Sequence, residues 1–111
     1  MRRENAFGKC IMKNNFAEKT EKTGAFFARV RGRVQGVGFR YSALREAQRL
    51  RLNGWVRNAA SGDVEVWAEG PAETLDLFLL WLKKGPQFSR VDTVDKIDQA
   101  PRGYRSFGVE Y

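Results

Sequence analysis

A short glycine-rich stretch, residues 34–40 (VQGVGFR), has the residue types of an anion-binding loop. Gly36 and Gly38 permit left-handed backbone angles, which let consecutive amide N–H groups turn toward one ligand. We expect a helix to begin directly behind this loop, and its free N–H groups would add a partial positive charge. Arg40 is unfavourable in a first helical turn unless an anion binds there, and its guanidinium fork could then hold two phosphate oxygens.

The spacing of these glycines leaves a second interpretation open. The stretch is not a dinucleotide fingerprint, because the third glycine and the later ribose-binding acid are missing, and no Gly-Lys-Ser/Thr follows as in a P-loop. A Gly-x-Gly pair is a weak motif by itself. On spacing alone, a tight strand-to-helix turn with a solvated arginine therefore has equal weight.

The composition limits the chemistry that could act on a bound anion. The chain contains no histidine, which excludes a histidine base and most zinc sites. We therefore predict no metal and no cofactor, and chemistry that works by positioning and charge or through carboxylates. Asp92, Asp95 and Asp98 recur at every third position, but the pattern is not a calcium loop and we expect solvated charges.

Length, charge and cysteine content suggest the number of domains, the charge of the partner and the cellular compartment. The 111 residues suit one domain, and the formal net charge of +7 favours an anionic partner. No apolar run is long enough to span a membrane, and the N-terminus does not resemble a secretory signal. The single cysteine, Cys10, allows no intramolecular disulfide, so we expect the reducing cytoplasm.

The hydrophobic pattern predicts the elements that must hold the loop. Alternating apolar and polar residues indicate strands over 26–34, 55–58, 64–68 and 90–97, with 107–111 as a fifth strand or a continuation of the fourth. Apolar residues at helical spacing indicate helices over 41–52 and from Gly70-Pro71 to Lys84. In the strand over 90–97, Val91 and Ile97 are the core candidates.

The order β-α-β-β-α-β, with the last two strands counted as one closing segment, indicates an α+β fold of the ferredoxin-like type. In this sandwich an antiparallel sheet carries both helices on one face. We assign it to residues 25–111. Residues 1–24 are polar and without period, and we expect a flexible N-terminal extension. A short strand or partner-binding segment is the alternative there.

Four segments in this order and spacing resemble the acylphosphatase family over residues 26–111: GRVQGVGFR, NGWVRN, SGDVEVWAEGP and SRVDTV. The resemblance implies hydrolysis of the carboxyl–phosphate bond of a small acyl phosphate, giving a carboxylate and inorganic phosphate, without metal or cofactor. It implies that Arg40 binds the phosphate and that Asn58 positions the attacking water. The residues implied to supply a cradle of backbone amides are Gln35, Gly36, Val37, Gly38 and Phe39.

The departures from the family are few. The extension is longer than a typical member needs, and Ala59 stands where many members carry a bulkier or hydroxylated residue. The carbamoyl-transfer maturation proteins that begin with such a domain continue into cysteine-rich zinc segments. Since those segments are missing here, we expect the free-standing enzyme, and we expect a monomer that spans no membrane.

The alternative function is a non-catalytic phosphate- or RNA-binding module of the same fold. Such sheets bind RNA by stacking bases on strand aromatics. The candidates for a basic, aromatic sheet surface are Trp55, Trp67, Tyr41 and Arg57. Against this alternative, Glu65 and Glu69 on the third strand would repel a phosphate backbone, so we do not expect nucleic acid as a partner.

Overall fold

The computed structural model describes residues 23–111, which form five strands and two helices. The strands are β1 (Thr23–Arg33), β2 (Asn53–Asn58), β3 (Val64–Pro71), β4 (Arg90–Gln99) and β5 (Phe107–Glu110). The helices are α2 (Phe39–Arg49) and α3 (Ala72–Lys84). β1 begins before the predicted domain boundary, because Thr23 and Gly24 pair with the end of β3. Residues 1–22 of the predicted extension lie outside the described residues.

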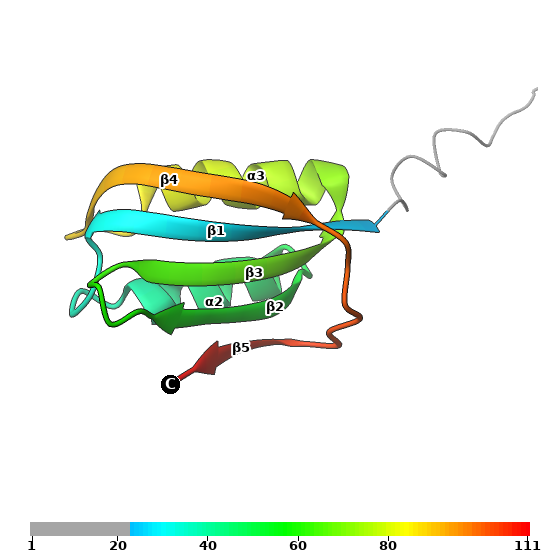
Figure 1. Ribbon diagram of the computed structural model, residues 1–111, viewed down its shortest axis with the longest axis horizontal. Helices are drawn as coiled ribbons and strands as arrows, with labels where there is room; N and C mark the ends of the chain where they lie inside the picture. Colours follow the sequence, from blue (N-terminus) through cyan, green and yellow to red (C-terminus); the bar gives the residue numbers. More distant parts are fainter. Residues whose placement is uncertain (1–22) are drawn as a thin grey trace, which may run out of the picture.

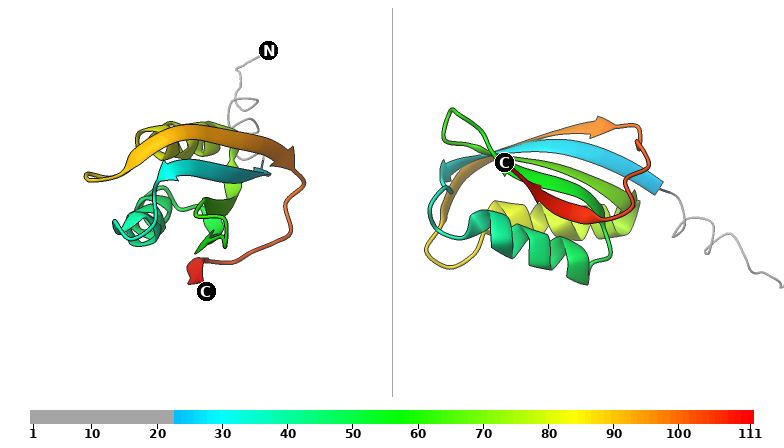
Figure 2. Two further views of the ribbon diagram at one scale, coloured as in Figure 1. Left: turned by 60° about the vertical axis from the view of Figure 1, so that its left-hand side comes forward. Right: turned by 90° about the horizontal axis from the view of Figure 1, so that it is seen from below.

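The strands form one sheet in the order β4-β1-β3-β2-β5, and both helices cover one of its faces (Figures 1 and 2). β1 to β4 pair antiparallel, which confirms the predicted ferredoxin-like βαββαβ sandwich. The last segment differs from a fully antiparallel sheet. β5 is a separate strand on the far edge, and it pairs parallel to β2.

The main core lies between the sheet and the helices. Inward-facing residues of β1 and β3 alternate with residues that face the other side, as a half-buried sheet requires. Phe78 of α3 lies at the centre of this core. Its ring stacks on Phe26 at 6.4 Å between centroids and meets the edge of Phe107 at 6.0 Å. Phe107 thereby ties the short strand β5 to the rest of the domain.

The other face of the sheet is not the open stacking surface of the RNA-binding alternative. Trp55 and Trp67 do lie on it, but they are only 8% and 3% exposed. Together with Ala25 they form a second, smaller hydrophobic cluster. Tyr104, from the crossover between β4 and β5, packs against it. Tyr41 was expected on the same surface, but it lies on α2, on the opposite side of the sheet.

In β4 the prediction of two core residues is correct for Val91 and wrong for Ile97. Val91 packs against the core, whereas Ile97 is 58% exposed. Ile97 pairs with Phe27, which faces the other side of the sheet, whereas Val94 pairs with the core residue Val30. The register between β1 and β4 shifts at this point: Arg31 pairs with Thr93 but Gly32 pairs with Val91, so β4 has one extra residue. Val91 and Val94, three residues apart, can therefore both face the core.

Both predicted helices differ from the structure at an end. α2 begins two residues before the predicted residue 41 and ends at Arg49, followed by Arg51 with φ of 60°. Pro71 is not the first residue of α3; it still belongs to β3 and has an extended backbone, with φ of −61° and ψ of 143°. Among residues 23–111, neither helix is long and apolar enough to cross a membrane.

Candidate active site

The glycine-rich loop joins the end of β1 to the start of α2, as predicted. Gly36 and Gly38 have φ of 76° and 77°, in the left-handed region that side chains disfavour. A Cβ atom at either position would meet nothing within 4 Å, so the space beside this backbone is open. The glycines are therefore required by the backbone angles and not by crowding.

Within residues 23–111, no side chain caps the start of α2. Gly38 is the N-cap residue and offers no side-chain hydrogen bond, and the first turn contains no acidic residue. The free N–H groups and partial positive charge of a helix N-terminus therefore face the loop without a side-chain acceptor. This end of α2 has the properties of an anion site.

Arg40 lies in this first turn and is half-buried. Within residues 23–111 it forms no ion pair with an acidic side chain. Its guanidinium carbon lies 5.1 Å from the centre of the Tyr111 ring. A cation that is held by an aromatic ring and not by a carboxylate keeps its hydrogen-bond donors for a ligand.

Asn58 is the last residue of β2, where it pairs with Val64 at the base of the β2–β3 hairpin. Its side-chain oxygen Oδ1 is buried and has no hydrogen-bond partner in the described part of the chain. A buried acceptor without a partner is costly and rare in folded proteins. It indicates that a ligand or water completes this site.

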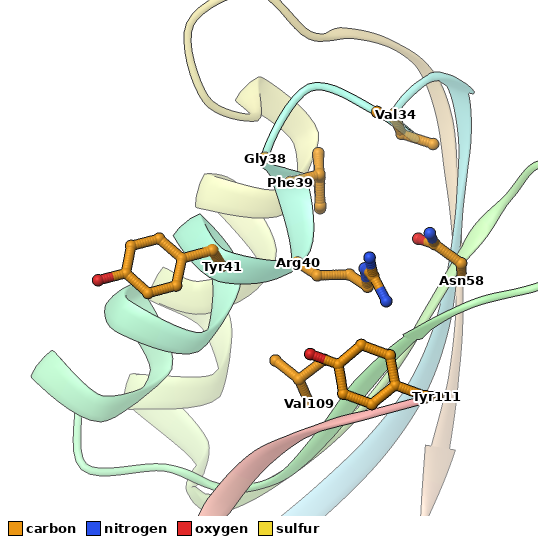
Figure 3. A pocket seen from close by; sticks show the side chains of 9 residues that line it. Val34, Gly38, Phe39, Arg40, Tyr41, Asn58, Val109 and Tyr111 are labelled. Carbon is orange, nitrogen blue, oxygen red and sulfur yellow. The ribbon is translucent and has the colours of Figure 1, made fainter.

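These features meet in one pocket with a cavity volume of about 190 Å³. Figure 3 shows the guanidinium of Arg40 and the amide of Asn58 facing the pocket from opposite sides, with Tyr111 below them. The lining residues are Val34, Gly36, Gly38, Phe39, Arg40, Tyr41, Asn58, Val109 and Tyr111. No lining side chain in the described part of the chain is a carboxylate, an imidazole or a thiol. The pocket is therefore suited to holding an anion, and it lacks the usual general bases.

Two residues of the predicted cradle lie outside the lining of the pocket. The side-chain amide of Gln35 turns to the β2–β3 hairpin, where Nε2 donates to the carbonyl oxygens of Ala59 at 2.8 Å and Asp63 at 2.9 Å. Val37 packs against the main core. Gln35 therefore joins the loop to the strand end that carries Asn58.

Sequence reasoning missed the part of the pocket that comes from the C-terminal strand. Val109 lies in β5 and Tyr111 follows it, about 70 residues from Arg40 in the chain. Both reach the pocket because β5 pairs beside β2. No local motif indicated this pairing.

An ion-pair network joins β1, β2 and β3 on the face of the sheet away from the helices. Glu65 of β3 accepts hydrogen bonds from Arg57 of β2 at 2.9 Å and Arg29 of β1 at 2.8 Å. Burial raises the pKa of Glu65, but the two arginines outweigh it and hold the pKa below its ordinary value. This carboxylate links β1 and β2 across β3.

No cluster that could hold a metal ion occurs among residues 23–111. The three aspartates of β4 are exposed. Asp92 pairs with Arg90, Asp95 with Arg31, and Asp98 with Lys96.

The chain is similar to known acylphosphatases in sequence and in structure. The family model described as Acylphosphatase matches residues 26–109. An acylphosphatase of Azoarcus sp. is 52% identical over 73 residues, which cover 66% of this chain and 74% of that protein. An acylphosphatase of Koribacter versatilis is 52% identical over 82 residues, 73% of this chain and 74% of that protein.

The crystal structure of acylphosphatase from Bacillus subtilis aligns with a TM-score of 0.78 and 39% identity, covering 79% of this chain and 99% of that one. The chain belongs to the acylphosphatase family.

Proposed function

We propose that the chain hydrolyses acyl phosphates in this pocket, with Arg40 as the phosphate ligand and Asn58 as the residue that positions water. The observation that carries the proposal is the unpartnered Oδ1 of Asn58, which lies across the pocket from the guanidinium of Arg40. Backbone N–H groups of residues 36–40 and the Arg40 fork would hold the phosphoryl oxygens. Asn58 Oδ1 would accept a hydrogen bond from the water.

The reaction needs little covalent help from the protein. The water oxygen attacks phosphorus as the bond from phosphorus to the carboxylate oxygen breaks, and the carboxylate leaves with the bonding electron pair. A carboxylate is a good leaving group, so no general acid is required. The proton of the water passes to a phosphate oxygen, because none of the described side chains that line the pocket is a general base. Positioning and charge stabilisation supply the catalysis.

Release of phosphate from benzoyl phosphate in the presence of a chelator tests this proposal. We expect the chelator to leave the native rate unchanged. Arg40→Ala should lower kcat/KM by about a thousandfold or more, because the arginine stabilises the transferring phosphoryl group. Asn58→Ala should lower kcat by about a hundredfold through loss of water positioning. Arg49→Ala, an exposed arginine on α2, is the matched control and should remain active.

A well-folded native protein without turnover would refute the proposal. The non-catalytic alternative would then be tested by RNA binding and its salt dependence. We do not propose nucleic acid as a partner, because the strand tryptophans are covered by the crossover. We propose that the enzyme acts as a monomer, since one chain supplies the whole described pocket, and that it works in the cytoplasm, since one cysteine allows no intramolecular disulfide. Light scattering tests the first of these.

A further inference from the structure

The crossover between β4 and β5, residues 100–106, must connect the two opposite edges of the sheet. It therefore passes β1, β3 and β2 before β5 begins (Figures 1 and 2). The segment contains no helix or strand. Its backbone N–H groups need hydrogen-bond partners outside the regular ladders.

Glu69 of β3 supplies those partners. Its Oε2 accepts a hydrogen bond from the backbone N–H of Arg102 at 2.5 Å, and its Oε1 accepts from those of Gly103 and Tyr104, each at 3.1 Å. The indole Nε1 of Trp67 donates a fourth hydrogen bond, to Oε2 at 2.8 Å. Glu69 is only 4% exposed. One buried carboxylate thus holds three consecutive backbone amides of the crossover.

Two further contacts fix the same part of the crossover to the sheet. The guanidinium carbon of Arg102 lies 4.2 Å from the ring centre of Trp67. The hydroxyl of Tyr104 accepts a hydrogen bond from Trp55 Nε1 at 3.2 Å. The β1 and β2 residues that pair with Glu69, Ala25 and Asn53, carry no charge.

The path from this attachment to the pocket is short. The carbonyl of Ser106 accepts a hydrogen bond from Gly54 N–H at 2.9 Å, and β5 then pairs with β2 from Phe107 onward. β5 has only four residues and one neighbouring strand. The crossover sets the position of Phe107. The position of Phe107 in turn determines where Val109 and Tyr111 meet the pocket.

We propose that Glu69 is a positioning residue for the phosphate site, acting through the crossover and β5 to place Tyr111 against Arg40. Glu69 touches neither Arg40 nor the pocket, so it is not a catalytic residue. The inference rests on the proposed function of the pocket, and it adds a determinant on the opposite face of the sheet.

The test compares E69Q with E65Q. Glutamine keeps the size of the side chain at residue 69 but turns one of its two acceptor oxygens into an NH₂ group, which faces backbone N–H donors. Glu65 is a matched control, because it lies on the same strand and the same face but accepts its hydrogen bonds from Arg29 and Arg57. The readouts are kcat and KM for benzoyl phosphate, the Ki of inorganic phosphate, and the NMR resonances of the Gly103 amide and the Trp67 indole.

We expect E69Q to raise KM and the Ki of phosphate by about two- to fivefold, with a smaller effect on kcat, since Tyr111 would no longer be held against Arg40. The two resonances should shift, while E65Q should leave them and both constants close to native. A folded E69Q protein with shifted resonances but native KM and Ki would overturn the proposal. An equal change in E65Q would overturn it too, because the effect would then be general destabilisation.

A second variant keeps the test decisive if E69Q does not fold. E69D retains the charge but is one methylene shorter, so it retracts the carboxylate from the crossover amides. It should raise KM in the same direction, and unchanged KM and Ki would overturn the proposal. Failure of the inference is distinguishable from failure of the proposed function: an inactive native protein refutes the function, whereas an active native protein with unaffected Glu69 variants refutes only the positioning role.

Discussion

The guanidinium of Arg40 lies over the ring of Tyr111, with 5.1 Å between the guanidinium carbon and the ring centre. The two residues come from the first turn of α2 and from the residue after β5 (Figure 3). The ring occupies one side of the cation and attracts it through the negative face of its π-system. This contact holds Arg40 in the pocket before any phosphate binds, and it lowers the entropy that binding must remove.

Tyr111→Ala should therefore weaken phosphate binding without abolishing turnover. An exposed cation–π contact is worth about 0.5–1 kcal/mol, so we expect KM for benzoyl phosphate to rise by about two- to fivefold. Tyr111→Phe keeps the ring and should have a KM close to that of the native enzyme. If both variants lost affinity equally, the hydroxyl group and not the ring would be responsible.

Gln35 should influence the reaction through Asn58. Its side-chain amide bridges the loop and the carbonyl oxygens of Ala59 and Asp63 in the hairpin. Gln35→Ala removes both hydrogen bonds, each worth about 1 kcal/mol, and frees the strand end that carries Asn58. We expect kcat to fall by about tenfold with a smaller change in KM, because Arg40 keeps its place.

Steady-state kinetics with benzoyl phosphate measure this division between kcat and KM. Gln48→Ala removes an exposed glutamine from α2 and serves as the control. A rise in KM alone for Gln35→Ala would contradict a role through the hairpin.

The stability of the domain should fall in acid because of two buried carboxylates. Burial raises the pKa of Glu65 and of Glu69, but hydrogen bonds from Arg57 and Arg29 to the first, and from the crossover amides and Trp67 to the second, lower both pKa values below the ordinary 4.5. A group whose pKa is lower in the folded than in the unfolded state stabilises the protein. This stabilisation is complete at a pH above the unfolded pKa, and it is lost as the pH falls through the folded pKa.

We therefore expect Tm to be nearly constant between about pH 7 and pH 5.5 and to fall below about pH 4.5, where carboxylates begin to bind protons in the unfolded chain. Thermal unfolding followed by circular dichroism measures this curve. E65Q should have a lower Tm than the native protein at neutral pH, and the difference should shrink in acid. A difference that stayed constant with pH would rule out the charge of Glu65 as its cause.

The local parts of the site could be predicted from the sequence, and the distant parts could not. The glycines, the turn into α2 and the position of Arg40 are set by residues next to one another, so backbone preference and charge were enough to place them. Val91 and Ile97 are an even number of residues apart and would share one face of a regular strand. The register shift between β1 and β4 places one extra residue in β4 and reverses that parity, and no pattern in the sequence indicated it.

The C-terminal wall of the pocket escaped prediction for a similar reason. A four-residue strand does not specify its own partner, and a parallel neighbour requires a long crossover whose path depends on other contacts. Here Glu69, 30 residues or more before the crossover amides, determines that path. A buried carboxylate that binds backbone N–H groups leaves no pattern in the sequence, since any three consecutive amides could serve.

Two reasons favour glycine at residue 38: its backbone angle and the space that a bound phosphate would need. Substitutions at this residue should separate them. Its φ of 77° disfavours a side chain, and the space beside it is open. Gly38→Ala should cost about 1–2 kcal/mol of stability through backbone strain, which thermal unfolding would detect. Gly38→Asn should stay close to native stability, because asparagine tolerates the left-handed region and is a favourable N-cap residue.

Activity should not follow stability in these two variants. Either side chain would extend into the space where we place the phosphate, so both should raise KM for benzoyl phosphate and the Ki of inorganic phosphate. Gly62→Asn is the matched control, since Gly62 also has a positive φ, of 100°, and open space around it but lies in the hairpin turn outside the pocket. A Gly38→Asn enzyme with native stability, KM and Ki would show that the phosphate does not approach this part of the backbone. Arg40 would then have to bind it from the Asn58 side of the pocket alone.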